Sequence, residues 1–288
     1  MILIADSGST KCDWLLHQDD QLVFKTNTVG LNPHILSVKQ LHKALKKNRL
    51  LLTYSDQIEH IYFFGAGCGT LKNQELIKKL LSACFVNAEI LVQEDLMAAA
   101  WAINKEPAVL CILGTGSNCA YFDGQQLSSK RPSLGYLLMD EGSGNSLGKR
   151  LLRSYYYRQM PQELVLSFEN QFNLDAARVV HKLYNSKTPN RYLAKFARFA
   201  IDHQEHPYIA IQIKEEIQEF INCHLLAYRK ELKRTKLYFV GSVAFYLKDF
   251  INEPLKGHGY EVTAFIQRPM EHILSKLSEA HSSKLKLS

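Results

Sequence analysis

Two short polar loops are the part of the sequence best suited to chemistry, because each combines glycine with hydroxyl side chains directly after an apolar run. The first is DSGSTK at residues 6–11, and the second is GTGSN at residues 114–118. Glycine allows a tight turn and a close approach to a ligand, while hydroxyl and backbone N–H groups bind polyanions. Asp6 offers a carboxylate to hydrated Mg²⁺, and Lys11 adds positive charge. Either loop alone is typical of a plain polar turn, but together they predict a site that grips a triphosphate.

The elements around the first loop follow from apolar periodicity. Three short strands joined by tight turns open the chain and indicate an antiparallel meander. Helices and strands then alternate, and the first helix starts at Ser37, with Val38, Leu41 and Leu45 expected on its buried face. The predicted order is β-β-β-α-β-α-β-α, with strands at 1–6, 13–16, 22–28, 58–64 and 89–92 and helices from 37, at 74–84 and at 96–103.

The same pattern begins again with the strand predicted at 108–113, which directly precedes the second loop. Residues 160–235 are predicted to be helical throughout and longer than the pattern needs, which indicates an insertion. One helix is expected to run through Phe245 and Phe250. Two copies of a mixed α/β unit are thus predicted, and a doubly wound nucleotide-binding fold is the alternative, although it normally has helices between all its strands. The remaining predicted elements are strands at 119–122, 126–128, 237–240 and 262–266 and a helix at 270–277.

Composition places the chain among ordinary globular proteins. It has 288 residues, of which 46% are apolar and 22% charged, and no stretch reaches the length of a membrane span. The apolar start lacks a basic leader, so a cytoplasmic location is expected. The net charge of +7 comes from separate helical segments, which argues against nucleic-acid binding. Six cysteines without metal spacing are expected to be reduced: Cys12, Cys68, Cys84, Cys111, Cys119 and Cys223.

Taken together, the two loops resemble the phosphate-1 and phosphate-2 loops of the actin, hsp70 and sugar-kinase superfamily, and residues 241–244 (GSVA) resemble its adenosine loop. Residues 6–11, 113–119 and 134–144 resemble more closely the N-acetylglucosamine kinase branch, the group of the BadF/BadG/BcrA/BcrD-type ATPases. The resemblance implies an α/β fold of two ribonuclease H-like (actin-like ATPase) domains with a cleft between them. The implied domains are 1–106 and 107–288, with a helical insertion at about 155–235 and a last helix, about 270–281, against the first domain.

The resemblance also implies an activity: ATP-dependent phosphorylation of an amino sugar, with N-acetylglucosamine phosphorylated at its C6 hydroxyl. Asp95 matches the family's catalytic base, which orients a sugar hydroxyl and accepts its proton; without the resemblance, Asp95 is equally well read as a helix cap. The implied sugar contacts are Asn32, Asp95, Asp140 and the backbone of Ser133, Leu134 and Gly135. The implied ATP contacts are Asp6 (to Mg²⁺ through water), Gly8, Ser9, Thr10, Lys11, Gly114, Thr115, Gly116, Gly241 and Ser242.

Some positions depart from the family pattern. Met139 stands where a glycine usually precedes Asp140 and Glu141, which places a larger side chain at the sugar pocket. Residues 142–150 resemble a P-loop, but the glycine spacing fails and Arg150 stands where Ser or Thr must bind Mg²⁺. Lys149 and Arg150 are therefore expected on a helix surface.

Two other functions stay open at this point. One is an ATPase that activates a radical dehydratase through an iron–sulfur cluster, although Cys119 and Cys223 do not match that arrangement. The other is an amino-sugar sensor without turnover. The expected ligands are ATP and a small amino sugar, rather than a nucleic acid or a membrane. The resemblance also implies that a homodimer is an option, since homodimers are common in the family.

Overall fold

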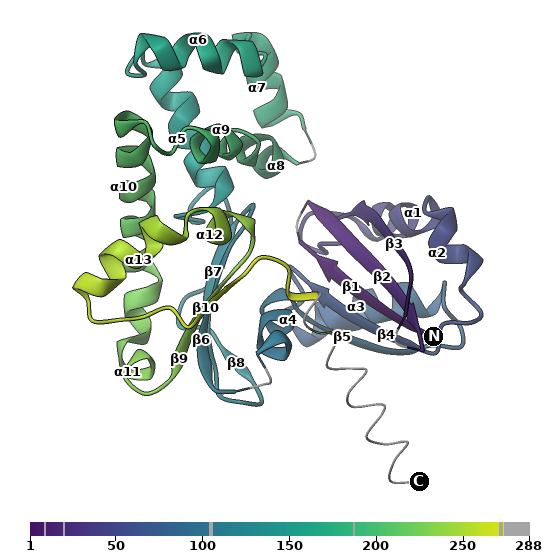
Figure 1. The fold of residues 1–288 in the computed structure, drawn as a ribbon. Coiled ribbons are helices and arrows are strands. Elements are labelled where there is room, and N and C mark those ends of the chain that lie inside the picture. Colours follow the sequence, from purple (N-terminus) through teal and green to yellow (C-terminus); the bar gives the residue numbers. More distant parts are fainter. Residues whose placement is uncertain (9, 20, 104–105, 187, 271–272, 274–288) are drawn as a thin grey trace. The chain divides into compact units, whose positions relative to one another are not determined.

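The computed structural model describes residues 1–288 apart from 9, 20, 104–105, 187, 271–272 and 274–288. The chain divides into two compact units (Figure 1). Unit 1 comprises Met1–Lys105 and the described residues from Arg268 onward, and unit 2 comprises Glu106–Gln267. Among the described residues, no helix combines the length and the apolar character needed to cross a bilayer.

Unit 1 is built on a five-stranded mixed sheet in the order β3-β2-β1-β4-β5. The strands β1 (Ile2–Ser7), β2 (Lys11–Gln18) and β3 (Gln21–Val29) form the predicted antiparallel meander. The strands β4 (His60–Gly65) and β5 (Glu89–Glu94) add to β1 in parallel. The carboxyl ends of β1, β4 and β5 therefore lie at one edge of the sheet, where the first polar loop also begins.

Helices cover both faces of this sheet, because successive strand residues point to opposite faces. The helices α1 (Val38–Lys46), α2 (Arg49–Thr53) and α3 (Leu71–Ser82) contribute to one core with Leu3 and Ala5 of β1. The helix α4 (Asp95–Ala102) packs on the other face with Ile4, and Met270 and Ile273 join that cluster. The predicted last helix otherwise lies outside the described residues.

The first helix bears out two of the three residues expected on its buried face. Leu41 and Leu45 are buried, but Val38 is 57% exposed, so that expectation is wrong. Val38 is the first residue of α1, next to the N-cap residue Ser37, where the helix has not yet reached the core.

Unit 2 repeats the strand order of unit 1. Its sheet runs β10-β9-β6-β7-β8, with the antiparallel meander β6 (Ala108–Leu113), β7 (Ser117–Phe122) and β8 (Leu127–Ser128). The strands β9 (Lys236–Val240) and β10 (Ala264–Ile266) extend β6 in parallel. The predicted repetition of one α/β unit is confirmed, and with it the ribonuclease H-like fold class.

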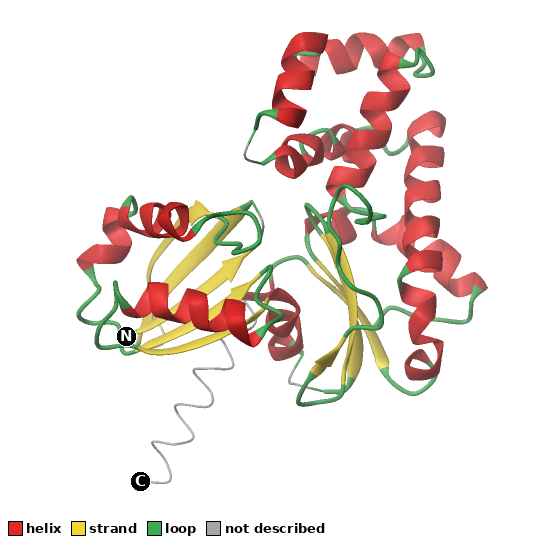
Figure 2. Ribbon diagram, turned by 180° about the vertical axis from the view of Figure 1, so that it is seen from behind, coloured by secondary structure: helices red, strands yellow, loops and turns green. Residues whose placement is uncertain are grey.

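The segment between β8 and β9 is helical, as predicted, and its helices build most of the large core of unit 2. The helices α10, α11 and α13 lie along one face of the sheet (Figures 1 and 2). The expectation of a single helix through Phe245 and Phe250 is wrong. The helix is divided at Leu247, whose backbone is not helical and whose side chain is buried in the core. The helices of unit 2 are α5 (Gly144–Tyr156), α6 (Gln162–Gln171), α7 (Ala176–Tyr184), α8 (Pro189–Ala194), α9 (Ala197–Asp202), α10 (Pro207–Cys223), the 3₁₀ helix η1 (Leu225–Tyr228), α11 (Arg229–Leu232), α12 (Ser242–Tyr246) and α13 (Lys248–Gly257).

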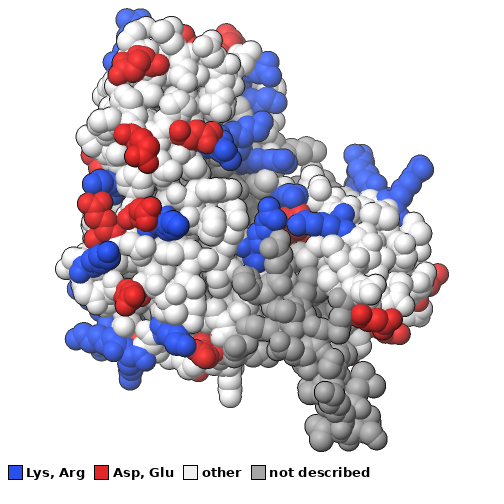
Figure 3. All heavy atoms as spheres, in the orientation of Figure 1, with Lys and Arg blue, Asp and Glu red and all other residues white. Residues whose placement is uncertain are grey.

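The basic residues of unit 2 are not gathered on the face that Figure 3 shows. Figure 3 shows Lys and Arg side chains at several separate places over the helices, with Asp and Glu side chains between them. Among the described residues of unit 2, Lys130 pairs with Glu231 and Lys214 pairs with Glu253. This dispersed pattern is that of charged outer helix faces.

Candidate active site

The first polar loop connects β1 to β2 in unit 1. Asp6 is the last but one residue of β1 and lies opposite Asp13 of β2. The hydroxyl oxygen of Thr10 is buried and has no hydrogen-bond partner among the described residues. Lys11 pairs with Asp13 at 2.6 Å, so its charge is shared with a carboxylate of the same hairpin. Ser9, which was also predicted to bind nucleotide, lies outside the described residues.

Gly8 has space around it, because a Cβ at this position would meet only the Lys11 carbonyl oxygen, at 3.7 Å. The backbone here is therefore accessible to a ligand.

Carboxylates gather at the carboxyl ends of the unit 1 strands. Burial, together with the negative charges of Asp95 and Asp13, raises the pKa of Asp6 to about 7. Glu94, at the end of β5, also has its pKa raised to about 7, first by burial and then by Asp95. Concentrated negative charge of this kind is relieved by a cation or by protonation.

Asp95 begins α4 directly after β5. Burial raises the pKa of its carboxyl group, while the backbone N–H of Leu96, which donates to Asp95 Oδ1 at 2.9 Å, opposes the rise. The side chain thus satisfies one N–H of the first helical turn, although the N-cap position itself is Glu94, which makes no side-chain capping bond. The same carboxylate stands at the edge of the sheet where Asp6 and Glu94 lie, so the geometry is compatible with the base interpretation as well.

Asn32 lies in a loop that is tied to the first polar loop. The residue is 6% exposed, and its Oδ1 accepts the N–H of His34 at 2.9 Å. The neighbouring Leu31 donates its N–H to the hydroxyl of Ser7 at 2.8 Å, and the Ser7 carbonyl accepts the N–H of Ala66 at 2.7 Å. Ser7 therefore joins three loops: the phosphate-1 loop, the Asn32 loop and the turn after β4.

The turn after β4 leaves room for Asn32. Gly67 has φ +82°, and a Cβ there would come within 2.4 Å of the Asn32 Oδ1. Neither Ser7 nor Gly67 was singled out from the sequence, because their partners lie more than 20 residues away and no local pattern connects them.

The second polar loop connects β6 to β7 in unit 2. The N–H of Gly114 donates to the Gly116 carbonyl at 2.9 Å, and Gly114 has no neighbour where a Cβ would be. A Cβ on Gly116 would lie 2.8 Å from the Asp140 carboxylate, so only glycine fits at that position. The hydroxyl oxygen of Ser117 is buried without a partner among the described residues.

Asp140 lies against this loop rather than apart from it. It has φ +73° and is 7% exposed. Its Oδ1 accepts the N–H of Ser117 at 3.2 Å, and its Oδ2 accepts the side-chain amide of Asn145 at 2.7 Å. Burial raises the pKa of Asp140, and these two hydrogen bonds oppose the rise. The sequence predicted Asp140 as a sugar ligand but did not predict its connection to the phosphate-2 loop.

The turn after Asp140 is held by one face of α10. His224 Nε2 lies 2.7 Å from Glu141 Oε2, and Glu216 Oε2 accepts the N–H of Gly142 at 3.2 Å. Phe220 lies between Glu216 and His224 in the sequence. It leaves no space for a side chain at position 142, because a Cβ added to Gly142 would lie 2.8 Å from the Phe220 Cβ. Positions 216, 220 and 224 are four residues apart and therefore share a helix face. Glu141, which had no role in the sequence analysis, is thus a partner of His224, the C-cap residue of α10.

Lys149 and Arg150 lie on helix α5, as expected, and both are half-buried rather than fully exposed. Lys149 Nζ donates to the Tyr136 carbonyl at 3.1 Å. Arg150 Nε donates to Glu216 Oε1 at 2.9 Å, and its guanidinium also pairs with Glu215. Both side chains connect α5 to neighbouring segments, because α5 is covered by α10 and by the loop before it.

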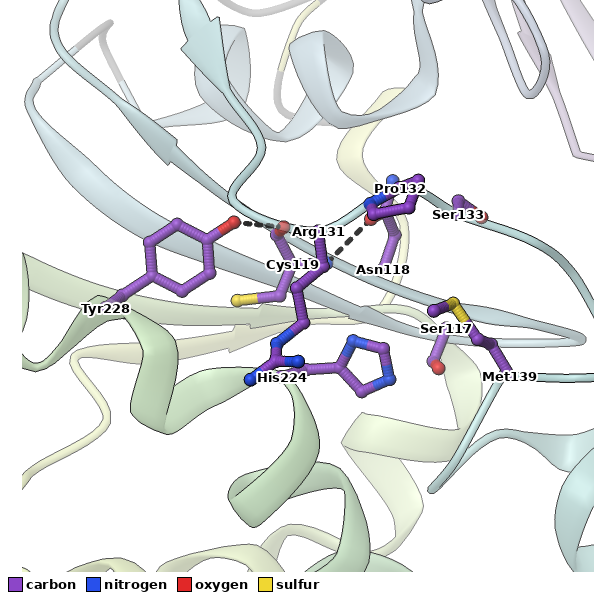
Figure 4. A pocket seen from close by; sticks show the side chains of 9 residues that line it. All are labelled: Ser117, Asn118, Cys119, Arg131, Pro132, Ser133, Met139, His224 and Tyr228. Atoms are coloured by element: carbon purple, nitrogen blue, oxygen red, sulfur yellow. Dashed lines mark hydrogen bonds between the residues drawn. The ribbon is translucent and has the colours of Figure 1, made fainter.

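A small pocket opens beside the phosphate-2 loop within unit 2 (Figure 4). Ser133, the first of the predicted backbone contacts, lines it, and Met139 forms part of its wall. Leu134 is 55% exposed, and Gly135 has φ +75°. The pocket is lined by Ser117, Asn118, Cys119, Arg131, Pro132, Ser133, Met139, His224 and Tyr228.

The predicted adenosine loop begins at Gly241, directly after β9. Gly241 has φ +106°, and a Cβ there would lie 2.6 Å from the Leu113 carbonyl oxygen. This glycine therefore packs against the end of β6, where the phosphate-2 loop starts. Ser242 is the first residue of α12.

Each of the two loops fits a polyanionic ligand. Thr10 in the first loop and Ser117 in the second each have a buried side-chain oxygen without a partner among the described residues. A buried polar atom without a hydrogen-bond partner costs about 1–3 kcal/mol of folding free energy. Oxygen atoms of this kind in the two loops therefore indicate positions that bind a ligand. The carboxylates around Asp6 fit a hydrated cation. Within the described ranges, no three His, Cys, Asp or Glu side chains are arranged to hold a metal directly.

Comparisons with known proteins agree with this architecture. No family model and no curated protein matched the sequence. Among solved structures, two proteins described as putative N-acetylglucosamine kinases are similar. The protein from Porphyromonas gingivalis is 32% identical, with a TM-score of 0.86, and the match covers 98% of this chain and 100% of that chain. The protein from Chromobacterium violaceum is 15% identical, with a TM-score of 0.71, and the match covers 95% of this chain and 97% of that chain. A ROK family glucokinase from Streptomyces griseus, solved with glucose and AMPPNP, has 13% identity and a TM-score of 0.61 over 94% and 97%.

The repeated sheet order, together with a hairpin loop of the same kind in each unit, defines an actin-like fold, which the similar solved structures share. At 32% identity over nearly the whole of both chains, the chain belongs to the N-acetylglucosamine kinase-like family of that superfamily. The predicted enzyme class, a sugar kinase, is confirmed by this membership.

Proposed function

We propose that the protein transfers the γ-phosphoryl group of ATP to an amino sugar, and that the acceptor is the C6 hydroxyl of N-acetylglucosamine. The description of the P. gingivalis relative supports the sugar. The glucose and AMPPNP bound to the S. griseus enzyme support sugar and ATP as ligand classes for this fold.

The observation that carries the proposal is the position of Asp95. Its carboxylate follows β5 at the same edge of the sheet as Asp6, near enough for its charge to raise the pKa of Asp6, and burial raises its own pKa. A carboxylate with a raised pKa is a better proton acceptor for a hydroxyl group than an ordinary aspartate. In the proposed reaction, Asp95 orients the sugar hydroxyl, accepts its proton as the oxygen attacks phosphorus, and ADP leaves with the bridging oxygen.

The phosphate chain of ATP is proposed to bind to both polar loops. Thr10 and Thr115 contribute hydroxyl groups, and the backbone at Gly8 and Gly116 contributes N–H groups. Gly114 lies beside the phosphates with its own N–H bonded to the Gly116 carbonyl. Mg²⁺, when bound, neutralises charge on the phosphates. Asp6 holds that ion through water, and Gly241 with Ser242 contacts the nucleoside.

The sugar is proposed to bind to Asn32, Asp95 and Asp140, with the backbone of 133–135 nearby. Asn32 and Asp140 are both buried and both already hydrogen-bonded to their own loops. Side chains fixed in this way lose little freedom on binding, which favours specificity over adaptability.

The test is ADP release from Mg-ATP with a panel of sugars, using wild-type protein and Asp95→Asn. Sugar-dependent release with N-acetylglucosamine, lost in Asp95→Asn while sugar binding remains, supports the proposal. The matched control is Asp249→Asn, an exposed aspartate in the first turn of α13, which should keep full activity. Sugar binding without ADP release from the wild type contradicts a kinase and favours a sensor.

A further inference from the structure

Four residues of unit 2 form a ring that is closed by hydrogen bonds and by the backbone between Thr115 and Ser117. The Asn145 side-chain amide donates to the Thr115 carbonyl and to Asp140 Oδ2, each at 2.7 Å. Asp140 Oδ1 accepts the N–H of Ser117, two residues after Thr115 in the phosphate-2 loop. The backbone N–H of Asn145 also donates to the Thr115 carbonyl, at 3.0 Å. Asp140 therefore cannot shift without moving the loop.

The orientation of the Asn145 amide is fixed by its partners. A backbone carbonyl and a carboxylate only accept hydrogen bonds, so the NH₂ group must face both of them. The Asn145 oxygen then points the other way, where it is buried without a partner among the described residues. A fully buried asparagine that leaves its own acceptor unsatisfied contributes mainly through its two donated hydrogen bonds.

Asn145 is placed for this task by α5. It lies in the first turn of the helix, after the N-cap residue Ser143, whose hydroxyl accepts the N–H of Ser146 at 3.3 Å. Gly144 donates its N–H to the Gly114 carbonyl at 2.8 Å, which attaches the helix start to the loop. The helix thus presents Asn145 between the loop and Asp140.

We propose that Asn145 is a positioning residue that ties Asp140 to the phosphate-2 loop, so that the sugar and the nucleotide strengthen each other's binding within unit 2. The inference rests on the proposed function, in which Asp140 holds the sugar and Thr115 holds a phosphate. Each ligand orders the same ring, so the second ligand finds it already ordered and binds with a smaller loss of freedom.

The test is calorimetric titration of N-acetylglucosamine with and without saturating Mg-ADP, a pair that cannot react. By linkage the same factor must appear when the order of ligands is reversed. Wild-type protein should bind the sugar about tenfold more tightly when Mg-ADP is present, within the usual range of such couplings. In Asn145→Ala each ligand should still bind alone, while the coupling factor falls below about threefold, well under that range.

The matched control is Asn190→Ala. Asn190 is a buried asparagine on α8 of the same unit, 7% exposed, and lies outside the hydrogen-bonded ring. Its replacement tests for a general effect of losing a buried amide and should leave the coupling as in the wild type. A coupling factor that is unchanged in Asn145→Ala, or absent from the wild type while both ligands bind, overturns the inference. Failure of the wild type to bind either ligand overturns the proposed function instead, and the inference with it.

A second measurement needs no variant, in case Asn145→Ala does not fold. Hydrogen–deuterium exchange of the wild type with N-acetylglucosamine alone should slow exchange in residues 114–118, although no nucleotide is present. The expected change is at least threefold, because the sugar holds the ring through Asp140. Unchanged exchange in this segment, at a sugar concentration that saturates binding, overturns the inference.

Discussion

The hydroxyl group of Ser7 accepts a 2.8 Å hydrogen bond from the backbone N–H of Leu31, 24 residues further along the chain. Ser7 is fully buried, and Leu31 directly precedes the proposed sugar ligand Asn32. The bond fixes the Asn32 loop to the end of β1. Without the hydroxyl, the Leu31 N–H would be buried without a partner.

Replacement of Ser7 by alanine is expected to weaken both folding and sugar binding. The unsatisfied N–H should cost about 1–3 kcal/mol of unfolding free energy. The freed Asn32 loop should raise the KM for the sugar several-fold, with a smaller effect on the KM for ATP. Urea unfolding and steady-state kinetics measure the two effects, and the exposed Ser82→Ala serves as control. Equal effects on both KM values would show that Ser7 does not act through Asn32.

The activity is expected to fall at acid pH through protonation of Asp95. Burial raises the pKa of this carboxyl group above the ordinary aspartate value of 3.8, so the base is lost at a higher pH than for an exposed aspartate. The acid limb of kcat/KM for the sugar should therefore have its midpoint above 3.8. Melting curves at each pH separate this loss from unfolding. Constant activity down to pH 4, with the fold intact, would rule out Asp95 as the base.

Asp6→Asn is expected to inactivate the protein and yet stabilise it above neutral pH. The folded-state pKa of Asp6 is raised from 3.8 to about 7, so folding favours its protonated form. Its contribution to stability is present below pH 3.8 and is lost as the pH rises through 7. A shift of about three pH units corresponds to at most about 4 kcal/mol.

The gain from Asp6→Asn should accordingly be larger at pH 8 than at pH 4, as measured by urea unfolding at both values. The exposed aspartate Asp249 provides the control, since Asp249→Asn should change stability little at either pH. A variant that is less stable than the wild type at pH 8 would show that Asp6 is stabilised by contacts rather than strained by burial.

The two glycines 135 and 142 should respond differently to alanine. Both have positive φ, +75° and +72°, so alanine strains the backbone at either position. At Gly135 nothing lies within 4 Å of the new Cβ, and the cost should be about 1–2 kcal/mol from the backbone alone. At Gly142 the new Cβ would lie 2.8 Å from the Phe220 Cβ, which adds overpacking of about 1–3 kcal/mol.

The difference between the two glycine variants isolates the contact with α10. Thermal or urea unfolding of both variants measures it, with Gly135→Ala as the matched reference. Equal losses of stability would indicate that the turn at 141–142 yields without cost and is not held firmly by Phe220.

The sequence predicts the strands and loops well because their signals are local. Apolar runs that end in small polar residues mark β1 and β6, and the two hairpin loops follow them directly. The order of strands follows once both halves are seen to begin with a meander. Local signals fail where contacts with distant parts of the chain determine burial or helix ends. Val38 is exposed at the start of α1. Leu247, which is buried in the core, divides a segment whose pattern predicts one continuous helix.

The site is predicted less completely than the fold, and for a related reason. Thr10, Thr115 and Asp140 belong to contiguous motifs, so they could be named. Ser7 was not assigned a role, because its partner Leu31 lies on another loop. The bonds that Lys149 makes to the preceding loop and Arg150 makes to α10 were not predicted, because the pattern of α5 does not reveal these neighbours. Long-range hydrogen bonds of this kind leave no periodic trace in the sequence.

The two sheets share one strand order, and their units differ mainly in a single connection. Between β3 and β4 the chain forms α1 and α2, whereas between β8 and β9 it forms everything from α5 to α11. Lengthening such a connection leaves the hydrogen bonds of the sheet intact and costs little closure entropy. The chain thus consists of two units with one strand order, of which the second carries the longer connection. Homologous chains are expected to differ in length at this connection before they differ in their strands.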